Sequence, residues 1–405
     1  MDGVTLSPAK QVLAGGQMLF VAFGALVLVP ILTGLDVRVA LFTAGIGTLV
    51  FQLVTRGQVP VFLASSFAFI APIAASVAQW GVADTMGGLL AAGLVYVLLS
   101  QVARVGGVAA INRILPPVVV GPVIMVIGLS LAPVAVSMAL GFQGDEQAVA
   151  TGTALLVALP TLLTALLVSV LGRGLLRLLP ILCAIVVGYS LSLMLGLVDF
   201  SPVRDAPWFA LPEFTSPSFN WQVILFMIPV AIAPAVEHIG DMVAISNVTG
   251  KNYVEKPGLH RTLLGDGLAT SAAATLGGPP NTTYSEVTGA VMLTKNFDPK
   301  VMTYGALFAI VLAMVGKFGA LLMTVPTVVM GGIMILLFGS IAAVGMNTLI
   351  KNQVDLTEAR NLVIVAITLV FGIGGMVFPL GNFQLQGIAL CAVTAIMLNL
   401  LLPKR

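Results

Sequence analysis

The sequence predicts an all-α polytopic membrane protein with fourteen transmembrane spans, arranged as two inverted repeats of seven, with short β-strand segments in the third and tenth spans. Three observations predict this fold. Hydrophobic residues make up 59% of the 405 residues, charged residues make up 8%, and the mean hydropathy is +1.09, far outside the range of soluble globular proteins. Apolar runs of spanning length recur along the whole chain. Lysine and arginine residues gather between alternate runs.

A window of about 20 residues, the length that crosses a bilayer as a helix, locates the spans in order. The polar tail from Met1 to Lys10 leads into the first apolar run without a cleavage site of the small-x-small type. We therefore expect a retained helix and not a signal peptide. The first set of spans covers residues 12–32, 37–55, 60–79, 86–106, 116–137, 149–172 and 175–197, and the second covers 221–249, 262–277, 279–295, 301–323, 325–346, 360–378 and 383–402.

The basic residues orient these spans. With a cytoplasmic N-terminus, the opposite side of the membrane receives only Arg38 and Arg204, and Lys317 falls within a span. This asymmetry predicts a multi-pass protein of the cell (inner or plasma) membrane with both termini in the cytoplasm. The cytoplasmic side receives the other fifteen, which are Lys10, Arg56, Arg104, Arg113, Arg173, Arg177, Lys251, Lys256, Arg261, Lys295, Lys300, Lys351, Arg360, Lys404 and Arg405.

An odd number of spans in each half makes the second half enter the membrane in the opposite orientation, which is the pattern of an inverted repeat. Short sequence matches support this reading. Gly45-Ile-Gly47 precedes Pro60 as Gly265-Asp-Gly267 precedes Pro280, and Pro116-Pro-Val-Val-Val-Gly121 resembles Pro326-Thr-Val-Val-Met-Gly331. The two halves are therefore expected to share one architecture.

Two spans are interrupted at matching places. The stretch from Gly277 to Lys295 begins with helix breakers and β-formers, ends in a helical pattern and carries Glu286 at the join, and its counterpart runs from Pro60 to Pro72. Irregular backbone at bilayer depth persists only where protein or a water-filled cavity satisfies its polar groups. We therefore predict that the two extended segments pair with each other or with a ligand at one central site. The alternative is that Ser65, Ser66 and the prolines only kink ordinary helices.

Three acidic residues, Glu237, Asp241 and Glu286, fall inside spans. A charge at the bilayer centre costs at least ~2.5 kcal/mol, so such residues suggest a functional site. Glu237 and Asp241 are four residues apart and share one helix face. Two carboxylates that close together, away from bulk water, favour a bound proton, which predicts proton coupling. The alternative is a structural role, with either acid bonded to hydroxyl groups of another helix or to Lys317.

For other polar residues near these acids, the sequence favours structural roles. His238 is rotated by about 100° from Glu237 around the helix, which favours packing or hydrogen bonding over ligand contact. Asp266 suits a helix cap or a bond between helices. Ser285 suits the N-cap of the helix that carries Glu286, whose free N–H groups would then face the cavity. Backbone donors beside carboxylate acceptors match a neutral cyclic imide or ureide and would repel an anion.

The sequence also disfavours several classes of function. It has no basic patch for nucleic acid, neither HExxH nor GxSxG for an intramembrane enzyme, and only two cysteines, which lie apart in apolar runs. We therefore expect a transporter, not an enzyme, with the lipid bilayer and a small molecule as its partners. No metal or organic cofactor is expected. An anion exchanger or a passive channel is a weaker alternative.

Three motifs resemble a known family. Gly278-Pro-Pro-Asn-Thr-Thr-Tyr-Ser-Glu-Val-Thr-Gly289 with Thr294-Lys295, Glu237-His-Ile-Gly240 and Ser65-Ser-Phe-Ala-Phe69 closely resemble the nucleobase–ascorbate (nucleobase:cation symporter-2) transporters, and within them the bacterial uracil-transporting branch. The resemblance runs over nearly the whole chain. It implies a core domain of residues 1–108 and 201–324 (spans 1–4 and 8–11) that moves against a gate domain of residues 109–200 and 325–405 (spans 5–7 and 12–14).

The resemblance further implies proton-coupled uptake of a neutral nucleobase by alternating access, with the proton as coupling ion. A homodimer through the gate domain is compatible with it. Glu237 and Asp241 would carry the coupled proton. The implied substrate contacts are the side chains of Glu237 and Glu286, backbone groups near Phe67 and Ser285, and apolar walls from Ala25, Tyr284 and Phe338.

The residues favour uracil over xanthine or urate, which stay the alternative substrates. An acid at Glu286 is the pattern of the uracil-transporting branch, where xanthine transporters tend to have Gln. Asp241 points the other way, because uracil transporters often carry His there. Val287 stands where the family signature usually has Asn, and Gln17-Met18 replaces a familiar Gln-His pair.

Overall fold

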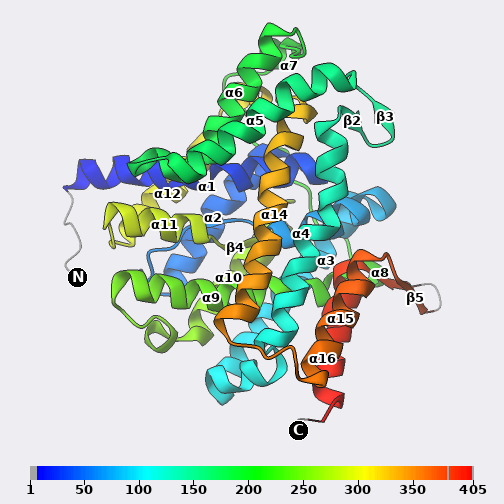
Figure 1. The fold of residues 1–405 in the computed structure, drawn as a ribbon. Helices are drawn as coiled ribbons and strands as arrows, with labels where there is room; N and C mark the ends of the chain where they lie inside the picture. The colour runs from blue at the N-terminus through cyan, green and yellow to red at the C-terminus, as the bar shows by residue number, and fades with distance from the viewer. Residues whose placement is uncertain (1–6, 381–382, 404–405) are drawn as a thin grey trace.

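In the computed structural model, residues 7–380 and 383–403 are described, and they form a predominantly helical protein (Figure 1). Among these residues, seven helical stretches are long and apolar enough to cross a membrane, and four more apolar helices are shorter. The helices are α1 (Pro8–Thr33), α2 (Val37–Val54), α3 (Ile70–Ile114), α4 (Pro117–Ala139), α5 (Thr151–Leu171), α6 (Pro180–Met194), α7 (Ser201–Asp205), α8 (Trp221–Met227), α9 (Ile232–Thr249), α10 (Leu259–Thr275), α11 (Ser285–Thr294), α12 (Lys300–Ala313), α13 (Gly316–Met323), α14 (Thr327–Lys351), α15 (Ala359–Ile373) and α16 (Gly387–Leu401). Helix α3 is interrupted by non-helical backbone at Gly81, between the predicted spans 60–79 and 86–106, and at Gly107.

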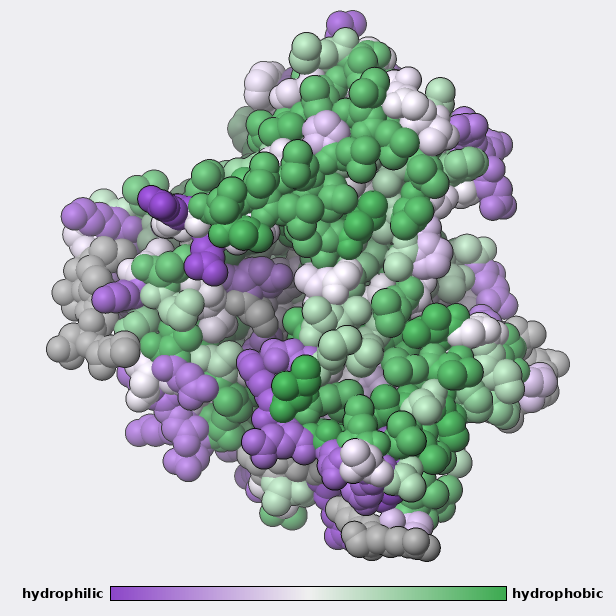
Figure 2. Space-filling view, in the orientation of Figure 1, coloured by the Kyte–Doolittle hydropathy of each residue, from purple (hydrophilic) through white to green (hydrophobic). Residues whose placement is uncertain are grey.

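The helices pack in two groups. Helix α10 packs against α2 and α3, and α12 packs against α1 and α2. Helix α14 packs along α4, with α5 and α6 on one side and α15 and α16 against α4 on the other (Figure 1). The space-filling view shows hydrophobic side chains over much of the face formed by the second group, as expected for helices that face lipid (Figure 2).

Helices α4 and α14 begin at matching residues. Pro116 and Pro326 are their N-cap residues, and both prolines have extended backbone. The two helices approach closely because small residues meet at their contact: a Cβ on Gly121 would lie 2.7 Å from the Leu349 side chain, and one on Gly345 would lie 2.6 Å from the backbone nitrogen of Met125. The two proline-led segments that resemble each other in sequence therefore form a packed pair.

The two interrupted spans pair their backbones, as predicted. Strand β1 (Leu63–Ser65) and strand β4 (Asn281–Thr283) form an antiparallel ladder in which Ala64 lies opposite Thr282. The backbone N–H of Ser66 extends the ladder by donating to the carbonyl oxygen of Pro280 at 2.9 Å. The alternative, that Ser65, Ser66 and the prolines only kink continuous helices, is wrong.

Side chains of the neighbouring helices hold this ladder in place. The Thr48 hydroxyl on α2 accepts a hydrogen bond from the backbone N–H of Leu63 at 3.0 Å. The side-chain amide of Asn281 donates to the carbonyl oxygen of Thr43 at 2.9 Å, and the hydroxyl of Thr270 on α10 donates to the carbonyl oxygen of Asn281 at 2.8 Å. Backbone polar groups that have no water at this depth thus find partners on α2 and α10.

Replacing Thr48 with valine is expected to lower stability while preserving side-chain volume. The change removes the acceptor for the Leu63 N–H at a fully buried position, which costs about 1–3 kcal/mol. Thermal unfolding of the detergent-purified protein measures the effect. Thr48→Ser keeps the hydroxyl and serves as the control. Equal melting temperatures for Thr48→Val and the unmodified protein would contradict the bond's role.

The predicted span 301–323 is wrong as a single helix. The chain breaks after Met314, where Phe209 forms a β-bridge with Val315, and then continues as α13. Lys317 therefore does not lie inside a continuous span. Its Nζ donates to the carbonyl oxygens of Val203 at 2.7 Å and Arg204 at 3.2 Å, in the segment that follows α6.

The predicted spans 360–378 and 383–402 are also too long. Their helices end at Ile373 and begin at Gly387, and a β-hairpin of β5 (Val377–Leu380) and β6 (Phe383–Gln386) joins them. A further hairpin, β2 (Phe142–Gln143) with β3 (Glu146–Gln147), follows α4. Strand structure is therefore not confined to the third and tenth spans; between β2 and β3, for example, Gly144 with φ 63° allows the tight turn.

Candidate substrate site

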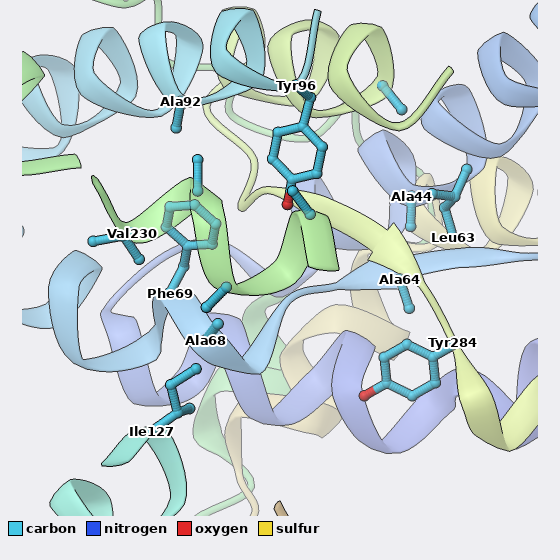
Figure 3. Close-up of a cluster of buried hydrophobic side chains, with 14 of the residues drawn as sticks. Ala44, Leu63, Ala64, Ala68, Phe69, Ala92, Tyr96, Ile127, Val230 and Tyr284 are labelled. Carbon is cyan, nitrogen blue, oxygen red and sulfur yellow. The ribbon is translucent and has the colours of Figure 1, made fainter. Parts of the chain in front are cut away.

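The site is built around the β1–β4 ladder, because each strand leads directly into a helix. Strand β1 continues into a short 3₁₀ turn at Phe67–Phe69 and then α3, and β4 continues into α11. The unpaired N–H groups of both first turns therefore lie beside the ladder, where they can act as donors. Figure 3 shows the two extended segments crossing between Tyr96 on one side and Tyr284 on the other.

The predicted N-cap at Ser285 is wrong by one residue. Tyr284 is the N-cap of α11, with φ −120° and ψ 114°, and Ser285 is the first helical residue. The extended backbone of β4 continues through Tyr284, and the helix begins at the next residue. Tyr284 is therefore the last non-helical residue, which is the N-cap position. The Ser285 side chain lies outside the described part of the structure, so its predicted contact rests on its backbone position at the start of α11.

Glu237 and Glu286, the two predicted substrate-binding acids, both have exposed side chains although their helices lie among buried residues. Glu237 projects from α9 and Glu286 from the first turn of α11. Glu237 also lies within electrostatic range of Asp241, Asp266 and Glu286. The face drawn in Figure 2 is hollowed beside the central helices, with hydrophilic side chains within the hollow. Two accessible carboxylates in an apolar bundle can accept hydrogen bonds from N–H donors.

Asp241 lies one turn further along α9 and is 5% exposed. Its Oδ2 accepts a hydrogen bond from the Thr283 hydroxyl at 2.8 Å, which links α9 to strand β4. The structural role that the sequence left open for Asp241, a bond to a hydroxyl group, is therefore present. The other option, a bond to Lys317, is wrong, since Lys317 bonds the carbonyl groups of Val203 and Arg204.

His238 and Asp266 form a buried pair between α9 and α10. Both side chains are fully buried, and His238 Nδ1 lies 3.3 Å from Asp266 Oδ2. The His238 ring also packs edge-on against Phe51 of α2. His238 therefore has the packing contact predicted for it, and Asp266 has a contact between helices, as predicted. The pair lies at the contact between α9 and α10, next in sequence to Glu237.

The predicted apolar walls come from different parts of the fold. The rings of Phe67 and Tyr284 lie 5.9 Å apart, centroid to centroid, at an angle of 47°. Phe338 on α14 is buried in a cluster with Ile70 and Leu131, and Phe67 packs against that cluster. Phe67 thus connects the ladder with the α14 group. Ala25 lies on α1, which contacts β1 and α11, and its side chain lies outside the described part.

Thr283 is the site residue whose role the sequence did not reveal. It belongs to the Asn-Thr-Thr segment, and strand alternation places it on the same face as Asn281. Strand alternation could have predicted that Thr283 and Asn281 share one face of β4. Only the packing of β4 against α9 shows that Asp241 lies next to Thr283. In the described part of the chain, no group of three or more His, Cys, Asp or Glu residues could hold a metal ion.

Comparison with known proteins identifies the family. Residues 9–381 match the model of the family described as "Permease family". The chain belongs to this permease family. It is 62% identical over 396 residues to the "Probable uracil permease" of Pasteurella multocida (98% of this chain, 94% of the relative) and 47% identical over 396 residues to the "Uracil permease" of Bacillus caldolyticus (96% and 91%). The resemblance predicted from the three motifs is thus confirmed, and this permease is a multi-pass membrane transporter, not an enzyme.

Solved structures of other transporters share the fold of this permease. The transmembrane domain of the cyanobacterial bicarbonate transporter BicA matches with a TM-score of 0.67 at 17% identity, covering 98% of each chain. Murine Slc26a9, an anion transporter in the inward-facing state, matches with a TM-score of 0.75 at 10% identity, covering 99% of this chain and 69% of the other. At such low identity the likeness concerns the fold alone.

Proposed function

We propose that this permease takes up uracil across the cytoplasmic membrane, coupled to the movement of a proton. The observation that carries the proposal is the pair of accessible carboxylates, Glu237 and Glu286, beside the backbone donors of the ladder. Uracil presents N–H donors and carbonyl acceptors on one small planar ring, so it can satisfy both kinds of group. The relatives named as uracil permeases, at 38–62% identity over nearly the whole chain, support the same substrate.

The proposed contacts with uracil follow from where the residues lie around the β1–β4 ladder. Glu237 and Glu286 accept the N–H groups of uracil, and the backbone N–H groups near Phe67 and Ser285 donate to its carbonyl oxygens. Phe67 and Tyr284, whose rings are tilted toward each other, cover the faces of the ring together with Ala25 and Phe338. An anion would meet two carboxylates here. The fold shared with anion transporters therefore does not extend to their substrates.

Glu237 and Asp241 are the proposed proton carriers. Both lie on α9, within electrostatic range of each other and of Glu286. Glu237 is open to the cavity, whereas Asp241 is bonded to Thr283 on the ladder. Protonation of Glu237 would change which hydrogen bonds its carboxyl group can form with uracil. Proton binding and uracil binding would therefore influence each other. No organic cofactor or metal takes part in this scheme.

The proposed movement is alternating access between a core domain (residues 1–108 and 201–324) and a gate domain (residues 109–200 and 325–405). Fourteen spans in two inverted halves are proposed to build them. The packing of α10 on α2 and α3, and of α14 on α4, supports this division. The ladder, centred on Ala64 and Thr282, has the local two-fold pattern of an inverted repeat. A homodimer would form through the gate domain.

Both termini are proposed to be cytoplasmic. The break between α12 and α13 places Lys317 beside the segment of Val203 and Arg204. The opposite side then holds three basic residues, Arg38, Arg204 and Lys317, against fifteen on the cytoplasmic side. Lysine and arginine residues are thus still in large excess on the cytoplasmic side, as is usual for membrane proteins.

Uptake of labelled uracil into cells that lack their own uracil transporter tests the function. We expect accumulation above the external concentration, faster uptake at acidic external pH, and loss of accumulation when a protonophore is added. Unlabelled uracil should compete fully and unlabelled xanthine weakly, because a bicyclic purine needs more space between Phe67 and Tyr284. Equal competition by xanthine would instead assign a purine substrate, and accumulation that survives the protonophore would contradict proton coupling.

A further inference from the structure

The segment between α6 and α8 carries a row of exposed aromatic residues. Among residues 206–221 the only charged residue is Glu213. We define the crossover surface as its five most exposed large apolar side chains, whose exposed fractions are between 68% and 80%. They are Trp208, Phe209, Leu211, Phe219 and Trp221.

This segment is fixed on the protein at three places. The backbone N–H of Gly316 donates to the carbonyl oxygen of Trp208, and the N–H of Ala210 donates to that of Met314, both at 3.0 Å. Further along, the N–H of Ser218 donates to the carbonyl oxygen of Ala83 at 2.9 Å. The crossover surface is therefore the outward side of an ordered segment, with its backbone bonded toward the helices.

Side chains reinforce the same attachment. Asp84 accepts hydrogen bonds from the Ser218 hydroxyl and from the Asn220 amide, the latter at 2.9 Å. The Phe214 ring packs edge-on against Phe42 of α2 at 5.1 Å. Phe214 is 42% exposed, less than the five residues of the crossover surface, because its ring contacts Phe42.

The crossover surface is continuous with surfaces that cross the membrane. Trp221 is the first residue of the apolar helical stretch 221–249, which is long enough to span a bilayer. Trp208 and Phe209 lie against residues 314–316, where the apolar helix α12 has just ended. Both groups of aromatic residues therefore stand at the ends of apolar helices, and aromatic side chains collect at the ends of such helices where a membrane meets water.

We propose that the crossover surface lies in the headgroup boundary of the bilayer, with its aromatic side chains inserted among the lipids. Tryptophan suits this place because its ring is apolar and its indole N–H can bond to water or headgroups. Lys317 lies over the Trp208 ring at 5.6 Å and bonds the carbonyl groups of Val203 and Arg204. The lipid contact would therefore anchor two of the connections between the two packing groups, α6 to α8 and α12 to α14.

Tryptophan fluorescence tests this placement, because the chain has three tryptophans, Trp80, Trp208 and Trp221. The double variant Trp80→Phe with Trp221→Phe leaves Trp208 as the only probe, and Trp80→Phe with Trp208→Phe leaves Trp221. A third variant, Trp208→Phe with Trp221→Phe, keeps Trp80, which packs against Phe226 on the protein. Uracil uptake by each variant verifies that it is folded.

Each variant is reconstituted into vesicles of phosphatidylcholine that carries bromine either near the headgroup or near the end of the acyl chain. For Trp208 and Trp221 we expect blue-shifted emission, strong quenching by the shallow bromine, weaker quenching by the deep bromine, and little quenching by aqueous acrylamide. Trp80 should be quenched less by the shallow bromine than either.

Two results would overturn the proposal. Full quenching by acrylamide with none by either brominated lipid would place the crossover surface in water. Protection from both acrylamide and brominated lipid would mean that a protein, such as a second copy of this chain, covers it.

Discussion

Replacing Glu286 with glutamine is expected to reduce the initial rate of uracil uptake by about 10- to 100-fold, because hydrogen bonds to charged groups contribute about 1.5–3 kcal/mol. The glutamine keeps the size of the side chain but removes its charge and half of its acceptor capacity. Since the Glu286 side chain is exposed, the change should leave the fold intact and act mainly by raising the KM for uracil. Uptake of labelled uracil over a range of concentrations measures the effect.

Glu255→Gln is the matched control for this experiment, since Glu255 is exposed and lies in the turn between α9 and α10, away from the ladder. Its uptake rate should equal that of the unmodified protein. Normal KM and rate in Glu286→Gln, with comparable amounts of protein in the membrane, would contradict the assignment of Glu286 as a substrate acceptor.

Replacing Gly47 with valine is expected to abolish uptake and to destabilise the protein. A side chain at Gly47 would overlap the amide of Asn281 and approach the Cβ of Ala269. It would therefore break the bond from Asn281 to the carbonyl oxygen of Thr43 and displace β4. Overpacking costs about 1–3 kcal/mol, and the lost buried hydrogen bond adds about 1–3 kcal/mol. Thermal unfolding and uracil uptake are the measurements.

Gly152→Val separates the clash from the effect of placing valine in a helix. Gly152 lies on α5, where an added Cβ would meet no heavy atom within 4 Å. This control should keep nearly normal uptake and a nearly normal melting temperature, because only helix propensity changes. If Gly47→Val behaved like Gly152→Val, the ladder would tolerate displacement, and the proposed dependence of the site on β4 would be wrong.

The pairing of β1 with β4 could be predicted from sequence, but the hydrogen bonds that hold this ladder against the neighbouring helices could not. Helix breakers and β-formers at matching positions of the two halves indicated extended chain, and the need to pair backbone groups in a membrane indicated that the two segments meet. The register depends instead on single contacts, such as Thr48 with Leu63 and Asn281 with Thr43. Such contacts join residues far apart in sequence, so no local pattern reveals them.

The errors in the predicted spans have a common cause. Hydropathy measures whether a segment is apolar and does not distinguish helix from strand or detect a break between two apolar helices. The segment around Met314 stays apolar through the break, and Val377 to Leu380 are apolar within a hairpin. Lys317 was therefore assigned to a span, whereas its partners, the carbonyl groups of Val203 and Arg204, lie more than a hundred residues away in the chain.

For the three acidic residues, the sequence predicted their importance but not their environments in the fold. Their presence in apolar spans identified Glu237, Asp241 and Glu286 as candidates, because charges inside a membrane are costly. Exposure separates their environments: Glu237 and Glu286 have exposed side chains, and Asp241 is buried and bonded to Thr283. This difference depends on how α9 packs against β4, and the sequence of α9 alone does not determine that packing.

Proton movement into proteoliposomes on addition of uracil tests the central claim most directly. Vesicles that contain the purified permease and a trapped pH-sensitive dye are exposed to external uracil without any other gradient. The account predicts acidification of the lumen that saturates with uracil concentration, is absent with Glu237→Gln, and is normal with Glu255→Gln. Entry of labelled uracil without any acidification would contradict proton coupling through Glu237.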